Sequence, residues 1–136
     1  MKTQKMTVGD LMSTALITLR PDDTVGDADY EMKMGAFRHI PIIDERHKLV
    51  GIVSNRDILR ALGKSSKGHV VIKDIMTKSL HRVSVNAPAR EAAALILDNK
   101  IGAVPVIGEE GQLVGVVTET DFVRVAYEVL GGDTAD

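Results

Sequence analysis

Apolar and polar positions follow each other along the chain in a pattern that predicts the same series of elements twice. Residues 25–34 and 89–99 carry apolar side chains at spacings of three and four, which is typical of helices with one buried face. Paired runs rich in valine and isoleucine, separated by polar residues, predict a β-hairpin after each of these helices. The predicted strands are residues 17–19, 39–43, 49–54, 82–85, 103–107 and 113–118, and the other predicted helices are residues 8–12, 55–62, 72–76 and 119–130.

The two series of elements form an internal repeat. Moving the chain by 64 positions places Asp10 on Asp74 and aligns the two halves without a gap. Between the copies lies a stretch of glycine, serine and lysine, a composition typical of an exposed linker. The pattern predicts a first repeat over residues 7–62, a linker over 63–70, a second repeat over 71–130 and a tail over 131–136.

The order of elements in each repeat, β-α-β-β-α, predicts an α+β fold. We expect two small sheets, each with helices on one side, packed about a pseudo-two-fold axis. Two interdependent halves are expected because an isolated unit of about 60 residues buries too little surface to be robust. A ligand is then expected in the cleft between the repeats.

Composition narrows the function classes. Hydrophobic residues make up 44% of the chain but aromatic residues only 3%, so aliphatic side chains must build the core. A net charge of −2 and so few aromatic rings give nucleic acid neither a basic field nor stacking surfaces. The chain has no cysteine, no histidine spacing typical of a metal site and no apolar stretch of about 20 residues. We therefore expect a cytoplasmic protein with no metal, no membrane and no nucleic-acid partner.

A duplicated motif joins each hairpin to its last helix. Residues 51–57 and 115–121 both read Gly, two apolar residues, a hydroxyl, two variable residues and Asp. The start of a helix favours a phosphate, and a carboxylate one turn later suits the paired hydroxyls of a ribose. A capping box explains the same spacing without any ligand, although it prefers Glu or Gln to Asp at its third position. The duplication and the Asp favour a nucleotide site, and capping stays open as the alternative.

With these motifs in place, the chain resembles a tandem pair of CBS domains, a Bateman module, over residues 7–128. The resemblance depends on residues 8–12 with 72–76, 38–44 with 102–107, and the two motifs that run from Gly to Asp. It implies that the hydroxyls of Ser54 and Thr118 contact phosphate, and that Asp57 and Asp121 hold the ribose.

The resemblance also implies which residues surround the phosphates and the base. Basic residues precede the proline of the first hairpin strand in many family members, and only the first repeat has them. The cationic candidates are Arg38, His39 and Arg56, which align with Gly102, Ala103 and Thr120 in the second repeat. Because the repeats are expected to face each other, Arg38 and His39 are candidates for the phosphates of either site and are not assigned to one. The candidates for the adenine pockets are Ile52 and Val116 and the backbone near Thr18, Ile40 and Val104. We expect the two sites to differ in affinity or in preferred phosphate number.

The sequence thus predicts a non-catalytic regulatory module that binds AMP, ADP or ATP between its repeats and signals energy or metabolite state to a partner protein. No cofactor is required, and the resemblance implies a homodimer formed through the helices. One alternative is a ligand-free dimerisation or scaffolding module, and another is a binder of S-adenosylmethionine or NAD. An enzyme is not expected, because no nucleophile is paired with a base.

Overall fold

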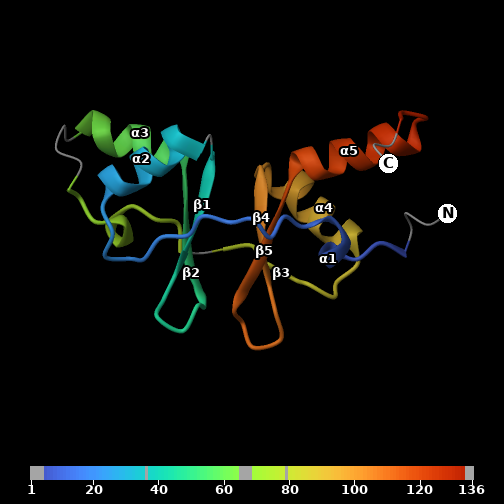
Figure 1. Ribbon diagram of the computed structural model, residues 1–136, viewed down its shortest axis with the longest axis horizontal. Coiled ribbons are helices and arrows are strands. Elements are labelled where there is room, and N and C mark those ends of the chain that lie inside the picture. The colour runs from blue at the N-terminus through green and yellow to red at the C-terminus, as the bar shows by residue number, and fades with distance from the viewer. Residues whose placement is uncertain (1–4, 36, 65–68, 79, 134–136) are drawn as a thin grey trace. The chain divides into compact units, whose positions relative to one another are not determined.

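The computed structural model describes residues 5–35, 37–64, 69–78 and 80–133, and has mixed α and β structure (Figure 1). Part of the predicted linker and part of the predicted tail lie outside the described residues. The elements of the first repeat are α1 (Val8–Leu11), α2 (Val25–Gly35), β1 (His39–Ile43), β2 (Leu49–Ser54) and α3 (Asn55–Lys64). Those that follow are η2 (Ile72–Asp74), β3 (Val83–Ser84), α4 (Ala89–Asn99), β4 (Ala103–Ile107), β5 (Leu113–Thr118) and α5 (Glu119–Val129).

The hairpin strands begin and end where the sequence predicts, but several other bounds differ. Helix α2 runs one residue beyond its predicted end, α3 runs two residues beyond, and α5 ends one residue early. The helical turn predicted over residues 72–76 is a shorter 3₁₀ turn, η2. The strand predicted over residues 17–19 is reduced to one parallel bridge between Leu19 and Ile42, and its counterpart β3 has two residues. Both expected strands are short because ladder pairing with the hairpin is limited to Leu19 in the first repeat and to Val83 and Ser84 in the second.

The chain folds into two compact units, and each unit combines segments of both sequence repeats. Unit 2 comprises Leu16–Leu80 and Gly111–Leu113, and unit 1 comprises the described residues up to Ala15, His81–Glu110 and the described residues from Val114 onward. The first segment of each repeat therefore lies in the unit that the other repeat mainly forms.

Equivalent backbone pairings hold these exchanged segments. In unit 1 Thr7 forms an antiparallel bridge with Pro88, and in unit 2 Val71 forms one with Thr24. The residue after Thr7 is a valine and the residue after Val71 is an isoleucine, and both have no exposed surface. Each exchanged segment thus contributes one fully buried aliphatic side chain to the core of its unit.

Both cores are built from aliphatic side chains and methionine, as the composition predicts. In each unit most buried side chains come from the hairpin, the helix before it and the exchanged segment, and one more comes from α3 in unit 2 and from β3 in unit 1. The core of unit 2 contains Val25, Ala28, Met32, Ile40, Ile42, Val53, Ile58 and Ile72. The core of unit 1 contains Val8, Val83, Ala92, Val104, Val106 and Val117.

Candidate functional site

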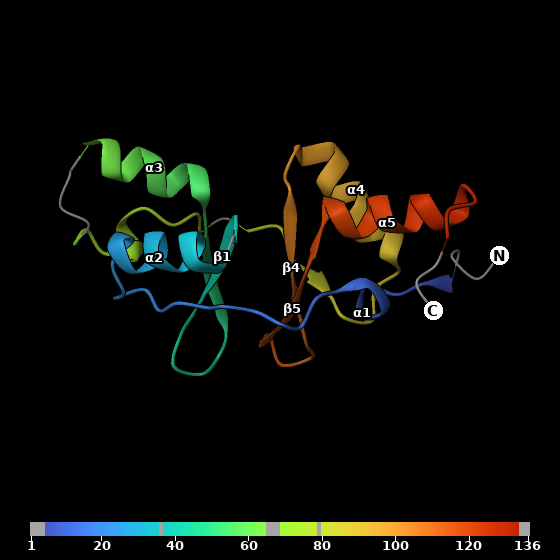
Figure 2. The ribbon, with the colours of Figure 1, turned by 45° about the horizontal axis from the view of Figure 1, so that its top comes forward.

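Each hairpin runs without a loop into the following helix, so the duplicated motif forms a strand-to-helix turn in each unit (Figure 2). In unit 2, β2 ends at Ser54 and α3 begins at the next residue; in unit 1, β5 ends at Thr118 and α5 begins at the next residue. The hydroxyl residues are the N-caps of their helices, and Asp57 and Asp121 occupy the third helical position. All four residues are half-buried.

Both turns are closed by a capping box. The Ser54 N–H donates to Asp57 Oδ2 (2.9 Å), and the Asp57 N–H donates to Ser54 Oγ (3.1 Å). The Thr118 N–H donates to Asp121 Oδ2 (2.8 Å), and the hydroxyl of Thr118 also lies 3.3 Å from that oxygen. The alternative that the sequence left open is therefore present in both copies. A ligand role for the two carboxylates has to use their other oxygen or displace the cap.

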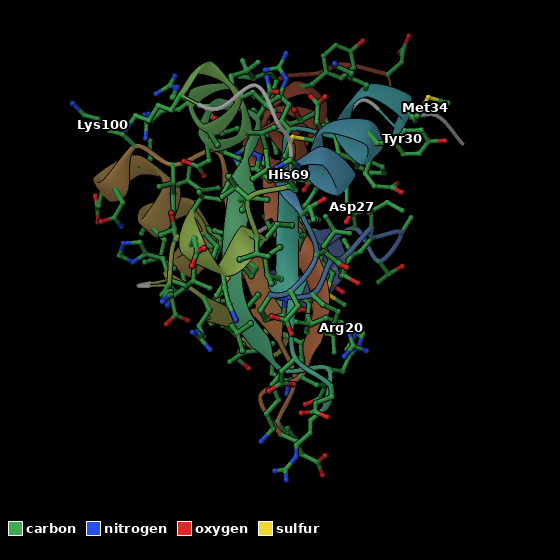
Figure 3. The ribbon with its side chains drawn as sticks, turned by 90° about the vertical axis from the view of Figure 1, so that its left-hand side faces the viewer. Arg20, Asp27, Tyr30, Met34, His69 and Lys100 are labelled. Atoms are coloured by element: carbon green, nitrogen blue, oxygen red, sulfur yellow. The ribbon has the colours of Figure 1, made fainter. Side chains whose placement is uncertain are left out.

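An Asp at the third helical position does not distinguish a ligand site from a simple capping box. The Thr7 N–H donates to Asp10 Oδ2 (2.9 Å) at the start of α1, and the Thr24 N–H donates to Asp27 Oδ2 (2.9 Å) at the start of α2. The inference that a short Asp marks a ligand site was therefore wrong: this chain also uses Asp in two capping boxes outside the duplicated motif. Figure 3 shows Asp27 at the beginning of α2.

The backbone amides at the two helix starts are mostly occupied. The Asn55 N–H donates to the carbonyl of Arg38 (2.8 Å), and the Glu119 N–H donates to the carbonyl of Gly102 (3.1 Å). The third amide of each helix is bound by its cap. At most one of the first three amides in each turn is left to a ligand, fewer than the motif alone indicates.

Three cationic or titratable residues have backbone positions next to the first turn. Arg38 is exposed, and its carbonyl is bound to Asn55, the first residue of α3. His39 lies directly opposite Ser54 across the β1–β2 ladder. Arg56 follows Asn55 and is exposed. The structure thus brings all three predicted cationic candidates to one turn of unit 2.

The apolar candidates divide into two classes. Ile52 is half-buried on the face of β2 that also carries the hydroxyl, and Val116 is 8% exposed. The side chains of Ile40 and Val104 have no exposed surface, so only their backbones are available to a ligand. Thr18 is half-buried and directly precedes the residue that pairs with β1. A base at the first turn would therefore meet the half-buried Ile52 and strand backbone, whereas Val116 at the second turn is buried and leaves mainly strand backbone.

Two hydroxyl residues beside the turns were missed at the sequence level. Thr77 pairs with Ile52 through two backbone hydrogen bonds (2.9 and 3.1 Å), and Ser13 pairs with Val116 in the same way (2.9 and 3.1 Å). Both hydroxyl residues are exposed. They occupy equivalent positions of the repeat. The recurrence of a hydroxyl at this position is the signal in the sequence by which they could have been found.

The glycine of each motif makes room for a methionine. A Cβ built on Gly51 would collide with the Sδ of Met76, and one built on Gly115 would lie 2.6 Å from the Sδ of Met12 and 2.9 Å from the carbonyl oxygen of Ser13. Heavy atoms of side chains do not approach so closely without displacement. These glycines are therefore required for packing of the exchanged segments, independently of any phosphate.

The two carboxylates of the motif differ in their surroundings. Arg124 Nη1 lies 3.5 Å from Asp121 Oδ1, so the oxygen that the cap leaves open in unit 1 faces a cation. Among the described residues, Arg60 makes no such ion pair with Asp57, although it is the equivalent arginine of the first repeat. The first turn therefore offers a carboxylate oxygen without this competitor, as well as more cationic side chains.

A model of the CBS domain matches residues 8–64 and again residues 72–128. A crystal structure of a Vibrio cholerae protein assigned to acetoin utilization (AcuB) is 35% identical, superposes with a TM-score of 0.85, and pairs 93% of this chain with 95% of that one. CBSX2 of Arabidopsis thaliana in complex with AMP is 32% identical with a TM-score of 0.80, over 91% of this chain and 98% of that chain. A CBS domain pair in complex with 5′-methylthioadenosine and S-adenosyl-L-methionine is 29% identical with a TM-score of 0.81, over 91% and 98% of the two chains.

Some relatives of the chain are much larger enzymes. Inosine-5′-monophosphate dehydrogenase of Methanocaldococcus jannaschii is 33% identical over 109 residues, which are 80% of this chain and 21% of the dehydrogenase. The chain therefore spans about a fifth of that enzyme's length. Within the described ranges, no helix has the length and apolar character needed to cross a membrane, and no group of three metal-ligating side chains gathers.

Proposed function

The chain belongs to the CBS domain family, and we propose that it is a non-catalytic regulatory module that binds adenine nucleotides at its duplicated strand-to-helix turns. The observation that carries this proposal is the first turn, where the backbone positions of Arg38, His39 and Arg56 adjoin the strand end and helix start that bear a hydroxyl and a carboxylate. Cations and a helix start suit phosphates, and a carboxylate suits ribose hydroxyls. The related structures in complex with AMP and with S-adenosyl-L-methionine support an adenosyl ligand.

Regulation requires that the ligand changes an equilibrium of the chain and that a partner reads the change. We propose that the chain acts as a homodimer and passes nucleotide binding on to a downstream protein. The cytoplasmic location stays a prediction from the composition. The chemistry that all candidate ligands share is adenosine, so a titration with AMP, ADP, ATP and S-adenosylmethionine decides among them.

A ligand-free scaffold is the second candidate, and the capping boxes favour it. They engage one oxygen of each carboxylate inside the chain, and the same boxes occur at α1 and α2. Thermal unfolding separates the two functions, because a ligand at about 100 times its dissociation constant adds about 2.7 kcal/mol to the folded state. A melting temperature that none of the four compounds raises would leave the scaffold as the function.

Removing Arg38 tests the phosphate contacts of the first turn. We expect Arg38→Ala to weaken ATP binding by about fivefold, close to 1 kcal/mol, because an exposed cation loses part of its charge-assisted hydrogen bond to solvent. The loss is expected to be smaller for AMP, which has fewer phosphates, and to shrink at high salt. Calorimetric titration with both nucleotides at two salt concentrations measures this. Arg46→Ala, an exposed arginine in the first hairpin turn, is the matched control. Equal affinities for AMP and ATP that Arg38→Ala leaves untouched would contradict the assignment.

Removing Arg124 tests the competition in the second turn. We expect Arg124→Ala to strengthen nucleotide binding in unit 1 by about two- to fivefold, because the ribose no longer competes with an exposed ion pair worth up to about 1 kcal/mol. Arg60→Ala is the control, since it removes the equivalent arginine where no ion pair with the carboxylate is described. A weaker second site in Arg124→Ala would mean that this arginine contacts the ligand itself.

A further inference from the structure

Two methionines lie beside the duplicated turns at equivalent positions of the repeat. Met12 follows α1, Met76 follows η2, and a shift of 64 positions places the first on the second. The atom nearest to a Cβ built on Gly115 is the Sδ of Met12. The atom nearest to a Cβ built on Gly51 is the Sδ of Met76. Each thioether is thus packed against the motif glycine of its own unit, and the nucleotide site proposed above gives neither methionine a role.

Both thioethers lie at the boundary between a core and solvent. Met12 packs against the core of unit 1 and Met76 against the core of unit 2, and both side chains are half-buried. The residues that follow them, Ser13 and Thr77, are exposed. Methionine fills irregular gaps in a core because its unbranched side chain is flexible. Each sulfur is therefore part of the packing and lies one residue from an exposed position.

One isolated backbone pairing holds the chain beside each methionine. In unit 2, Thr77 and Ile52 exchange two hydrogen bonds (2.9 and 3.1 Å). In unit 1, Ser13 and Val116 also exchange two (2.9 and 3.1 Å). Among the described residues neither pairing extends into a ladder. An isolated pairing opens locally with little loss of other structure, so the packing of the adjacent methionine has a large share in keeping it closed.

We propose that Met12 and Met76 are reversible oxidation sites, at which a peroxide loosens the exchanged segment of each unit. In the reaction one oxygen atom of hydrogen peroxide is transferred to the thioether sulfur. The O–O bond breaks, an S–O bond forms, the sulfur gives up two electrons and the remaining oxygen leaves as water. Two thiols of a sulfoxide reductase supply the electrons for the return: they form a disulfide, and the sulfoxide oxygen leaves as water.

Oxidation is expected to remove the side chain from its packed position. Methionine sulfoxide is polar, and its oxygen accepts hydrogen bonds. Held against a glycine and an aliphatic core, that oxygen would be a buried acceptor without a donor, which is unfavourable. The oxidised side chain therefore turns toward solvent, and the pairing with Ile52 or Val116 weakens. These two residues are the aliphatic candidates for the adenine pockets. A lower nucleotide affinity after oxidation rests on the proposed function, whereas the loosened pairing does not.

Amide hydrogen exchange followed by NMR, before and after treatment of the full chain with hydrogen peroxide, measures the loosening. We expect the amides of the two pairings to exchange about tenfold or more faster after oxidation, because a buried unsatisfied acceptor shifts the opening equilibrium by that order. Peptide mass spectrometry locates each added oxygen atom. Reduction with methionine sulfoxide reductases and a thiol should restore the slow exchange.

Single variants make each unit the control of the other. Leucine fills a similar volume and has no sulfur to oxidise. In Met76→Leu we expect peroxide to speed exchange at Val116 but not at Ile52, and in Met12→Leu we expect the reverse. Met34→Leu is the matched control, because Met34 is 70% exposed and projects outward from α2 (Figure 3). This variant keeps both proposed sites and should respond as wild type does, so exchange can be compared with the oxidised fraction at each site even if a leucine disturbs the packing.

Three outcomes overturn the inference. If peroxide oxidises Met34 but neither Met12 nor Met76 in the folded chain, the two thioethers are shielded. If both are oxidised and exchange is unchanged, their side chains do not hold the exchanged segments. If a chain with both leucine changes responds as wild type does, another methionine is responsible. AMP titration of the unoxidised chain reports on the nucleotide proposal separately: a chain that binds no AMP but loosens on oxidation keeps the two oxidation sites and loses only their effect on a ligand.

Discussion

Replacing Asp57 with Asn is expected to weaken nucleotide binding at the first turn by about 1.5 to 3 kcal/mol, the range of a hydrogen bond to a charged group. Asp57 uses Oδ2 to accept the Ser54 N–H (2.9 Å). An Asn side chain keeps one carbonyl oxygen for this cap, but it replaces the second acceptor with a donor and removes the charge. The free energy of unfolding is therefore expected to change far less than the affinity. Calorimetric titration and urea denaturation of the same preparation measure the two quantities.

The chain supplies its own control for this experiment. Asp27 caps α2 with the same hydrogen bonds, from the Thr24 N–H (2.9 Å) and to Thr24 Oγ1 (3.1 Å), and it belongs to neither duplicated turn. We expect Asp27→Asn to match Asp57→Asn in stability and to bind nucleotide as wild type does. If the two variants bind nucleotide equally well, Asp57 is only a cap and the ribose role is wrong.

The hairpins were predictable to the residue because two local signals coincide there. In β1 and β2 the β-branched run ends where polar turn residues begin, and β2 gives way at Ser54 to a hydroxyl that caps the next helix. Helix ends lacked such a pair of signals. The end of α3 lies at Lys64, two residues beyond the predicted end, because the helix continues through Gly63, a residue that usually marks a helix end.

The exchange of leading segments was not predictable from the repeat alignment. The alignment gives Val8 and Ile72 the same place in each repeat, and an apolar residue of this kind can be buried in either core. The structure places Val8 with the core of the second repeat and Ile72 with the core of the first. Which core each residue joins depends on contacts across many residues, which periodicity does not report.

The same limit applies to the candidate site. The sequence located the hydroxyls, the carboxylates and the cations of the first turn, because they lie within one motif or one strand of it. It did not reveal that Gly51 contacts Met76, since that contact joins positions 25 residues apart in different elements. The motif glycine had no role of its own at the level of the sequence, and the structure gives it a packing requirement that holds without a ligand.

That requirement leads to the second large effect, on stability. We expect Gly115→Ala to lower the free energy of unfolding by about 1 to 3 kcal/mol, the usual cost of overpacking. Its Cβ would lie 2.9 Å from the carbonyl oxygen of Ser13, which is fixed by its pairing with Val116, and 2.6 Å from the Sδ of Met12. Gly51→Ala is expected to cost less, because the atoms nearest its Cβ belong to the flexible side chain of Met76.

Double variants separate the side-chain contact from the backbone contact. In a Met76→Ala background the Gly51→Ala change should lower the free energy of unfolding only slightly, because the obstructing side chain is gone. In a Met12→Ala background the Gly115→Ala change should keep most of its effect on the free energy of unfolding, because the Ser13 carbonyl remains. Gly63→Ala is the control: no atom lies within 4 Å of its added Cβ, so the helix should gain about 0.5 to 1 kcal/mol from the better helix former. Urea denaturation followed by circular dichroism gives each free energy. The packing role of Gly115 is contradicted if Gly115→Ala is as stable as wild type, or if its loss of stability disappears in the Met12→Ala background. Either result would show that the exchanged segment moves to make room for the added Cβ.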